Sequence, residues 1–104
     1  MKTDDHRKKD LLLVVDCGTQ SLRTLIFDTK GTLLAGRKQE YKPYVSPRPG
    51  WAEQDAGIFW KALVEGCQGL KKEYPDCFEK IAGMGVTSQR DTMINMDREG
   101  QPLR

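Results

Sequence analysis

The stretch LLLVVDCGTQSLRTLIF, residues 11–27, places a turn of small and polar residues between two apolar runs. The first run, residues 11–15, is apolar without interruption, which is typical of a strand buried on both faces of a sheet. The second run, residues 22–27, predicts the neighbouring strand. A sheet with a strand of this kind needs helices to cover it, so the stretch predicts an α/β fold.

The turn between the two runs has the chemistry of a phosphate site. Backbone N–H groups and hydroxyls of a tight turn can point at phosphoryl oxygens, and the residues that supply them here are Gly18, Thr19, Gln20 and Ser21. Asp16, just before the turn, can hold a Mg²⁺ directly or through water. Arg23, just after it, can bind negative charge bidentately. The same spacing also fits an ordinary hairpin with an acidic shoulder, because turns of Gly, Thr and Ser are common.

The residues that follow complete a three-stranded meander. Residues 28–31, Asp-Thr-Lys-Gly, have turn chemistry, and Gly31 suits a positive φ. Residues 33–41 become polar and charged, which is typical of an edge strand. Residues 43–52 hold three prolines and a glycine, which exclude regular structure there.

A helix is predicted over residues 56–74, with Asp55 as its N-cap and Pro75 as the residue that closes it. Apolar side chains recur at intervals of three or four residues and predict one buried stripe, made of Trp60, Leu63, Cys67, Leu70 and Tyr74.

Residues 81–86 are a second buried-type strand, and residues 92–96 predict a further short strand before a turn at 97–100. A helix between two buried strands implies a right-handed crossover. We therefore expect strand 11–16 to pair in parallel with strand 81–86.

Polar side chains follow the second buried strand directly, as Gln89, Arg90 and Asp91. In open α/β sheets, ligands bind at the carboxyl ends of parallel strands. An amide, a guanidinium and a carboxylate can together bind vicinal hydroxyls of a polyol. A polar turn with a weak Arg–Asp pair is the simpler alternative. Because strand 11–16 ends at the same edge, both motifs are expected to face one cleft.

Length and charge narrow the class of protein. A chain of 104 residues is at most one domain, and a net charge of +2 with mixed signs argues against a nucleic-acid or membrane surface. Residues 1–10 are polar and predict a disordered tail. The three cysteines lack CxxC spacing and indicate reduced thiols. With no signal peptide or spanning segment in the sequence, we expect a cytoplasmic protein.

Three blocks, in order and at familiar separations, resemble the FGGY family of carbohydrate kinases. Residues 16–23, DCGTQSLR, fit the family's Asp-x-Gly-Thr-x-Ser-x-Arg. Residues 49–55, PGWAEQD, with Trp60 after them, are similar to its Pro-Gly-Trp-x-Glu-Gln-Asp block. Residues 85–92, GVTSQRDT, are similar to its Gly-Val-Thr-Asn-Gln-Arg-Glu-Thr block.

The resemblance implies an RNase H-like (actin-like ATPase) mixed sheet with a crossover helix, in which residues 11–104 form a partial N-terminal domain. It implies an ATP-dependent sugar or polyol kinase that uses Mg²⁺. Asp16 would lie near the metal through water, and Arg23 would be catalytic by carrying charge of the transferred phosphate. The turn residues Gly18, Thr19, Gln20 and Ser21 would bind the phosphates of ATP, and Gln89, Arg90 and Asp91 would contact substrate hydroxyls.

The catalytic base of the family is an aspartate from the second half, which this chain lacks, so the chain alone is expected to be inactive. Two departures from the glycerol-kinase pattern, Asp91 in place of glutamate and Gln20 in place of threonine, favour an acceptor larger than glycerol. Another actin-like ATPase and a short non-catalytic binding module stay as alternatives, although the block at 49–55 argues against the first. The parent is compatible with a homo-oligomer.

Overall fold

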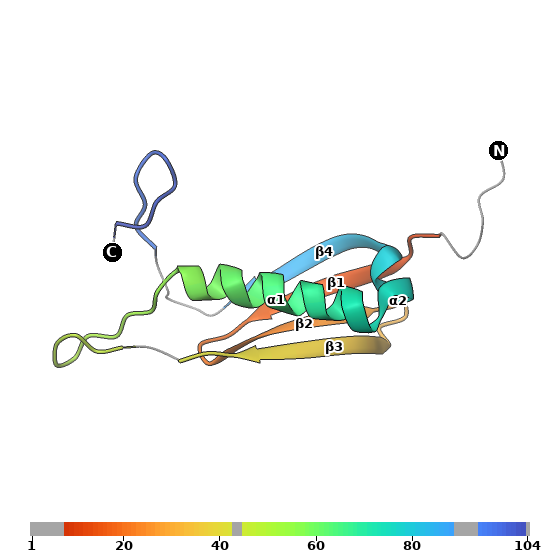
Figure 1. Cartoon of the computed structure of the whole chain (residues 1–104), viewed down its shortest axis with the longest axis horizontal. Coiled ribbons are helices and arrows are strands. Elements are labelled where there is room, and N and C mark those ends of the chain that lie inside the picture. Colours follow the sequence, from red (N-terminus) through yellow and green to blue (C-terminus); the bar gives the residue numbers. More distant parts are fainter. Residues whose placement is uncertain (1–7, 43–44, 89–93, 104) are drawn as a thin grey trace.

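The computed structural model describes residues 8–42, 45–88 and 94–103. Its sheet has the spatial order β3-β2-β1-β4 (Figure 1), with strands β1 (Leu11–Cys17), β2 (Ser21–Phe27), β3 (Leu33–Glu40) and β4 (Ile81–Ser88). β1 pairs antiparallel with β2 and parallel with β4, and β2 pairs antiparallel with β3. The predicted meander and the predicted parallel pair are both confirmed.

Helix α1 (Gly57–Glu73) lies over β2 and β3 and makes one face of the sheet the core. The side chains that β1 and β2 turn towards this helix layer are buried, namely Leu11, Leu13 and Val15 of β1 and Leu22, Thr24 and Ile26 of β2. The expectation that β1 is buried on both faces is wrong for the described residues, since Leu12 is 44% exposed. The reason is that no described element packs on that second face.

The face that α1 buries overlaps the predicted stripe in part, since Leu70 is fully buried and Leu63 and Cys67 are partly buried against the core. Its buried residues are Ala62, Gly66 and Leu70, whereas Trp60 is 68% exposed and Tyr74 is 39% exposed. Small residues at positions 62 and 66 let the helix lie close to β2, and the helix turns this small-residue line towards the sheet. The large aromatic side chains are thereby left at the margin of the contact.

Both ends of α1 depart from prediction in detail. The N-cap position is Ala56, but the Asp55 carboxylate still accepts a hydrogen bond from the Gly57 N–H at 3.0 Å. Pro75 does not simply end the helical region, because it opens a second short helix, α2 (Pro75–Glu79). Proline suits the first turn of a helix, where its missing N–H costs nothing.

The two predicted turns are confirmed and have the same hydrogen bonds. Asp28 Oδ1 accepts the N–H groups of Lys30 and Thr32, and Asp97 Oδ1 accepts those of the equivalent residues, all at 2.9 Å. The N–H of Thr32, with help from that of Lys30, lowers the pKa of the Asp28 carboxyl. Gly31 has the expected positive φ, +86°.

The strand predicted over residues 92–96 is not seen in its described part. Residues 94–95 have no regular structure, and Met96 makes only an isolated bridge with Pro102. Because the bridge closes the turn at 97–100, this segment is a small hairpin-like loop and not a further strand of the sheet.

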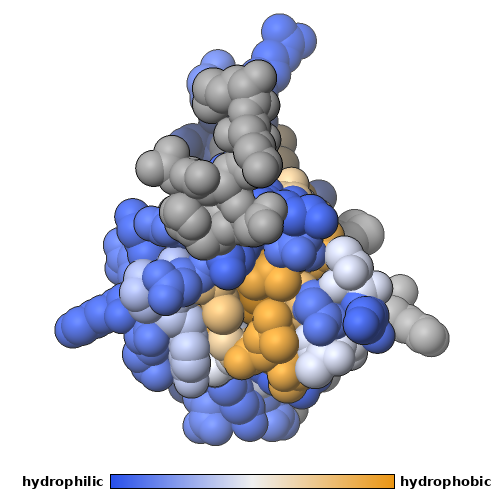
Figure 2. All heavy atoms as spheres, turned by 90° about the vertical axis from the view of Figure 1, so that its right-hand side faces the viewer, coloured by the Kyte–Doolittle hydropathy of each residue, from blue (hydrophilic) through white to orange (hydrophobic). Residues whose placement is uncertain are grey.

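Apolar surface stays exposed at two places. Met84 and Val86 of β4 are register partners of buried β1 residues, yet they are 59% and 63% exposed because α1 packs over β2 and β3. At the end of the sheet next to α2, Figure 2 shows apolar surface gathered among hydrophilic side chains. Among the described helices, none has the length and apolar character needed to cross a bilayer.

Candidate functional site

The turn between β1 and β2 is tight, and its first residue explains why. The Gly18 N–H donates to the Ser21 carbonyl at 2.9 Å, which closes the turn on itself. A Cβ at position 18 would lie 3.1 Å from that same carbonyl oxygen, closer than ordinary van der Waals contact. Glycine at this position therefore allows the backbone to fold back directly after Cys17.

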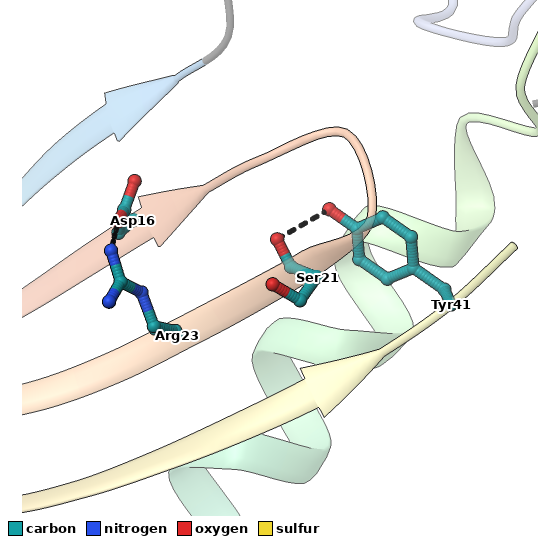
Figure 3. A network of polar contacts seen from close by, with 4 residues as sticks. All are labelled: Asp16, Ser21, Arg23 and Tyr41. Carbon is teal, nitrogen blue, oxygen red and sulfur yellow. Dashed lines mark hydrogen bonds and ion pairs between the residues drawn. The ribbon is translucent and has the colours of Figure 1, made fainter. Parts of the chain in front are cut away.

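Asp16 and Arg23 flank this turn as cross-strand register partners, and their side chains form an ion pair (Figure 3). The Arg23 side chain is 53% exposed and that of Asp16 is 33% exposed. Exposed ion pairs contribute only about 0–1 kcal/mol. Breaking this pair therefore costs little. Asp16 can then bind a cation and Arg23 an anion, as their predicted roles require.

Tyr41, immediately after β3, fixes the turn from the side of α1. Its hydroxyl lies 3.1 Å from the Ser21 carbonyl (Figure 3) and also donates to the Gly18 carbonyl. Its N–H donates to Gln20 O at 3.0 Å. Its ring packs edge-to-face on Phe59 of α1, with centroids 5.5 Å apart. Burial raises the pKa of the Tyr41 phenol well above its usual value, with further contributions from Cys17 and Asp16.

Gln54 holds the same turn from the segment before α1. Its Nε2 donates to the Thr19 carbonyl at 2.9 Å. The segment itself is anchored by a bridge between Val45 and Glu53, whose N–H groups and carbonyls exchange hydrogen bonds of 2.6 and 2.8 Å. The block at residues 49–55, which the resemblance singled out without a role, thus delivers a donor to the turn.

Lys38 is a further cation at the site that sequence reasoning missed. It is the register partner of Arg23 on β3, so Asp16, Arg23 and Lys38 form a row across three strands on the face away from α1. One hollow of about 240 Å³ is lined by Asp16, Gly18, Ser21, Arg23 and Lys38. A second, of about 400 Å³, is lined by Gln20, Ser21, Lys38, Glu40 and Tyr41. Both lie beside the predicted phosphate turn.

The end of β4 lies beside the end of β1. Asp16 is the register partner of Thr87, and Cys17 is the partner of Ser88. The predicted meeting of the two strand ends is therefore confirmed. The predicted substrate residues Gln89, Arg90 and Asp91, which follow Ser88 in the sequence, lie outside the described residues.

The donor set suits a magnesium ion that keeps most of its other ligands. In the described ranges, no three side chains of His, Cys, Asp or Glu gather into a metal site. Mg²⁺ in phosphoryl-transfer sites takes one or two carboxylates and fills its octahedron with water and phosphate oxygens. The single carboxylate of Asp16 fits that chemistry.

Comparisons with known proteins show the family and the fold of the chain. The model of the FGGY family of carbohydrate kinases, N-terminal domain, matches residues 11–104. A glycerol kinase of Herminiimonas arsenicoxydans is 36% identical over 96 residues, which is 91% of this chain and 19% of the relative. A glycerol kinase of Ligilactobacillus salivarius is 38% identical over 93 residues, 88% of this chain and 18% of the relative.

Solved structures of sugar kinases share the fold. A xylulose kinase from Brucella ovis superposes with a TM-score of 0.86 at 29% identity, covering 90% of this chain and 20% of that one. A Plasmodium falciparum glycerol kinase with ADP has a TM-score of 0.78 at 25% identity, covering 93% and 20%. The expected actin-like ATPase fold with a mixed sheet is thereby confirmed. The chain spans about a fifth of the length of the relatives that it matches.

Proposed function

Because the chain belongs to the FGGY family of carbohydrate kinases, we propose that it is the N-terminal part of an ATP-dependent kinase that phosphorylates a hydroxyl of a sugar or polyol. The observation that carries the proposal is the register of β1 and β4. It brings the β1–β2 turn, which we propose to bind phosphate, beside the end of β4, and residues 89–91 follow β4 in the sequence. Ligands of open α/β sheets bind at this edge.

In this proposal the turn binds the phosphates of ATP. Backbone N–H groups and hydroxyls of residues 18–21 contact phosphoryl oxygens, and Arg23 leaves Asp16 to bind the transferred phosphate. Asp16 would hold a Mg²⁺ through water, and the metal would supply positive charge beside the phosphates. Phosphoryl transfer depends mainly on positioning and electrostatic stabilisation, which these groups supply without covalent chemistry of their own.

The acceptor side of the proposal rests on the sequence. Gln89, Arg90 and Asp91 bind hydroxyls of the acceptor, and an aspartate from the remainder of the kinase removes its proton. Asp91 is one methylene shorter than the glutamate of glycerol kinases, so the proposed acceptor is larger than glycerol. ATP and three free cysteines favour a cytoplasmic kinase.

The first test is binding by the chain itself. We expect Mg·ATP to shift the backbone amide resonances of residues 16–23 in ¹H–¹⁵N spectra, with little change in the turn at residues 97–101. Adenosine, which lacks phosphates, is the matched control and should leave residues 16–23 unmoved. Equal shifts with adenosine and Mg·ATP, or none with either, would contradict the phosphate role of the turn.

The second test is catalysis by the full-length kinase that carries this segment. A coupled ADP assay with glycerol, D-xylulose and gluconate as acceptors should show sugar-dependent ATP turnover, with glycerol the poorest of the three. Absence of turnover with any sugar or polyol would overturn the kinase proposal, and a preference for glycerol would overturn only the proposed acceptor size.

A further inference from the structure

Each carbonyl of the β1–β2 turn, residues 18–21, accepts a hydrogen bond from another group of the chain. The Gly18 carbonyl accepts from the Tyr41 hydroxyl, and the Thr19 carbonyl accepts from Gln54 Nε2. The Gln20 carbonyl accepts from the Tyr41 N–H. The Ser21 carbonyl accepts from the Gly18 N–H and lies 3.1 Å from the Tyr41 hydroxyl.

The N–H groups of the same turn show the opposite pattern. Within the described part of the chain, neither the Thr19 N–H nor the Gln20 N–H has a hydrogen-bond partner. Gly18 differs, because its N–H closes the turn on Ser21. The turn is therefore asymmetric, with its acceptors occupied by the protein and two of its donors left for another group.

Peptide geometry connects the two patterns. In a trans peptide the carbonyl of one residue and the N–H of the next point in opposite directions across a rigid plane, and the described chain has no cis peptide bond. Holding the Gly18 carbonyl therefore directs the Thr19 N–H away from Tyr41. Holding the Thr19 carbonyl directs the Gln20 N–H away from Gln54.

We propose that Tyr41 and Gln54 are positioning residues, which hold the turn by its carbonyls so that the Thr19 and Gln20 N–H groups face the phosphate oxygens of ATP. The inference rests on the proposed phosphate role of the turn. Neither residue needs to touch the nucleotide. Tyr41 acts from a fixed position, because its ring packs on Phe59 and its N–H also contacts the turn.

Two variants remove one anchor each and keep the shape of the side chain. Tyr41→Phe deletes the hydroxyl and keeps the ring on Phe59. Gln54→Glu replaces the donor that faces the Thr19 carbonyl with an acceptor. Tyr74→Phe and Gln68→Glu, on exposed parts of the helical layer, are the matched controls for the two chemical changes.

The readout is affinity for a phosphate ligand, measured on the full chain by ¹H–¹⁵N titration with Mg·ATP and with inorganic tripolyphosphate. We expect wild type and both controls to show the same dissociation constant. Each anchor variant should bind both ligands about fivefold to tenfold more weakly, the size of one lost hydrogen bond. The tripolyphosphate-induced shifts of the Thr19 and Gln20 amides should also shrink, which a loss of stability alone would not produce in the folded population.

The outcomes separate this inference from the proposed function. If wild type binds phosphate ligands and both anchor variants bind them equally well, the positioning role is wrong while the phosphate site stands. If wild type does not bind them, the phosphate role falls and the inference falls with it. Should Tyr41→Phe fail to fold, Gln54→Glu, at an exposed side-chain contact, decides the question by the same measurement.

Discussion

The hydroxyl of Thr24 on β2 lies against the backbone of Gly66 on α1, so close that an ideal Cβ at position 66 would be 2.8 Å from Thr24 Oγ1. Thr24 is fully buried, and its hydroxyl has no hydrogen-bond partner among the described residues. This contact sets how near the helix comes to the sheet. It also explains why small residues, and not the aromatic side chains of Trp60 and Tyr74, face the core at this contact.

Gly66→Ala should therefore destabilise the chain. Overpacking a rigid core contact costs about 1–3 kcal/mol, and the better helix propensity of alanine recovers up to about 1 kcal/mol. We expect a net loss of about 1–2 kcal/mol in the free energy of unfolding, measured by urea titration. Gly85→Ala, where an added Cβ meets nothing within 4 Å, is the control. The loss should shrink in a Thr24→Ala background, and an undiminished loss there would contradict the contact as its cause.

Arg23→Gln and Asp16→Asn should lower turnover of the full-length kinase much more than they lower stability of the chain. The ion pair between them is exposed, so its loss should change the free energy of unfolding by less than about 1 kcal/mol. A lost charge-assisted hydrogen bond to phosphate is worth about 1.5–3 kcal/mol, which corresponds to a decrease of roughly tenfold to a hundredfold in kcat. Unchanged kcat in both variants would remove these residues from the site.

Arg90→Ala should lower kcat/KM for the acceptor. The loss of a charge-assisted contact to substrate hydroxyls should weaken transition-state binding by about 2–3 kcal/mol. The KM for ATP should change little, because the proposed nucleotide contacts belong to the other motif, residues 16–23. Steady-state kinetics with the acceptor and the nucleotide varied separately make this distinction. An unchanged specificity constant for every accepted sugar would exclude the substrate role of Arg90.

Tyr41 should make stability depend on pH in the alkaline range. Its pKa is raised in the folded chain, so the stabilisation is fully present below the usual tyrosine pKa of about 10 and is lost as the pH rises towards the folded value. From pH 9 to 11, the free energy of unfolding should fall more steeply for wild type than for Tyr41→Phe. At pH 11, absorbance at 295 nm should show a smaller ionised fraction of tyrosine in wild type than in Tyr41→Phe, and equal fractions in the two proteins would refute the assignment.

The isolated chain should self-associate through β4. Met84 and Val86 are exposed on the outermost strand of the described sheet, and such edges favour pairing with another copy. We expect sedimentation velocity to show concentration-dependent association that Met84→Lys and Val86→Lys reduce. Lys61→Glu, on the exposed face of α1, is the control for altered charge. A wild-type chain that stays monomeric at all concentrations would contradict this expectation.

Local patterns in the sequence were sufficient for the four strands of the sheet and both Asp-x-x-Gly turns, whereas the strand predicted over residues 92–96 is not seen in its described part. Each of these depends on residues close to one another in the chain, where alternation and turn chemistry act directly. The parallel pairing of β1 with β4 was also predictable, because a helix between two buried strands leaves few topologies. Trp60 was misplaced because more than one line of residues along α1 recurs at helical spacing, and periodicity alone cannot choose between them.

The parts of the site that could not be predicted depend on strand register. Lys38 joins the row of Asp16 and Arg23 only because β3 pairs with β2 in the register that sets position 38 opposite position 23. Tyr41 reaches the turn only because β3 ends level with the start of β2. A bulge between Ile26 and Phe27 shifts the pairing of β2 with β3 by one residue, and no local sequence pattern predicts it.

The parallel register of β1 and β4 also has a consequence for the order of folding. β1, β2 and β3 contact their neighbours in sequence, and such local hairpins close rapidly, whereas a β1–β4 contact must close a loop that contains the whole of α1. During synthesis the β1–β2 turn and Tyr41 both leave the ribosome well before Ser88. We therefore expect the β1–β2 turn, the proposed nucleotide part of the site, to fold first. The end of β4, which precedes the proposed acceptor residues, should join it only when β4 pairs with β1.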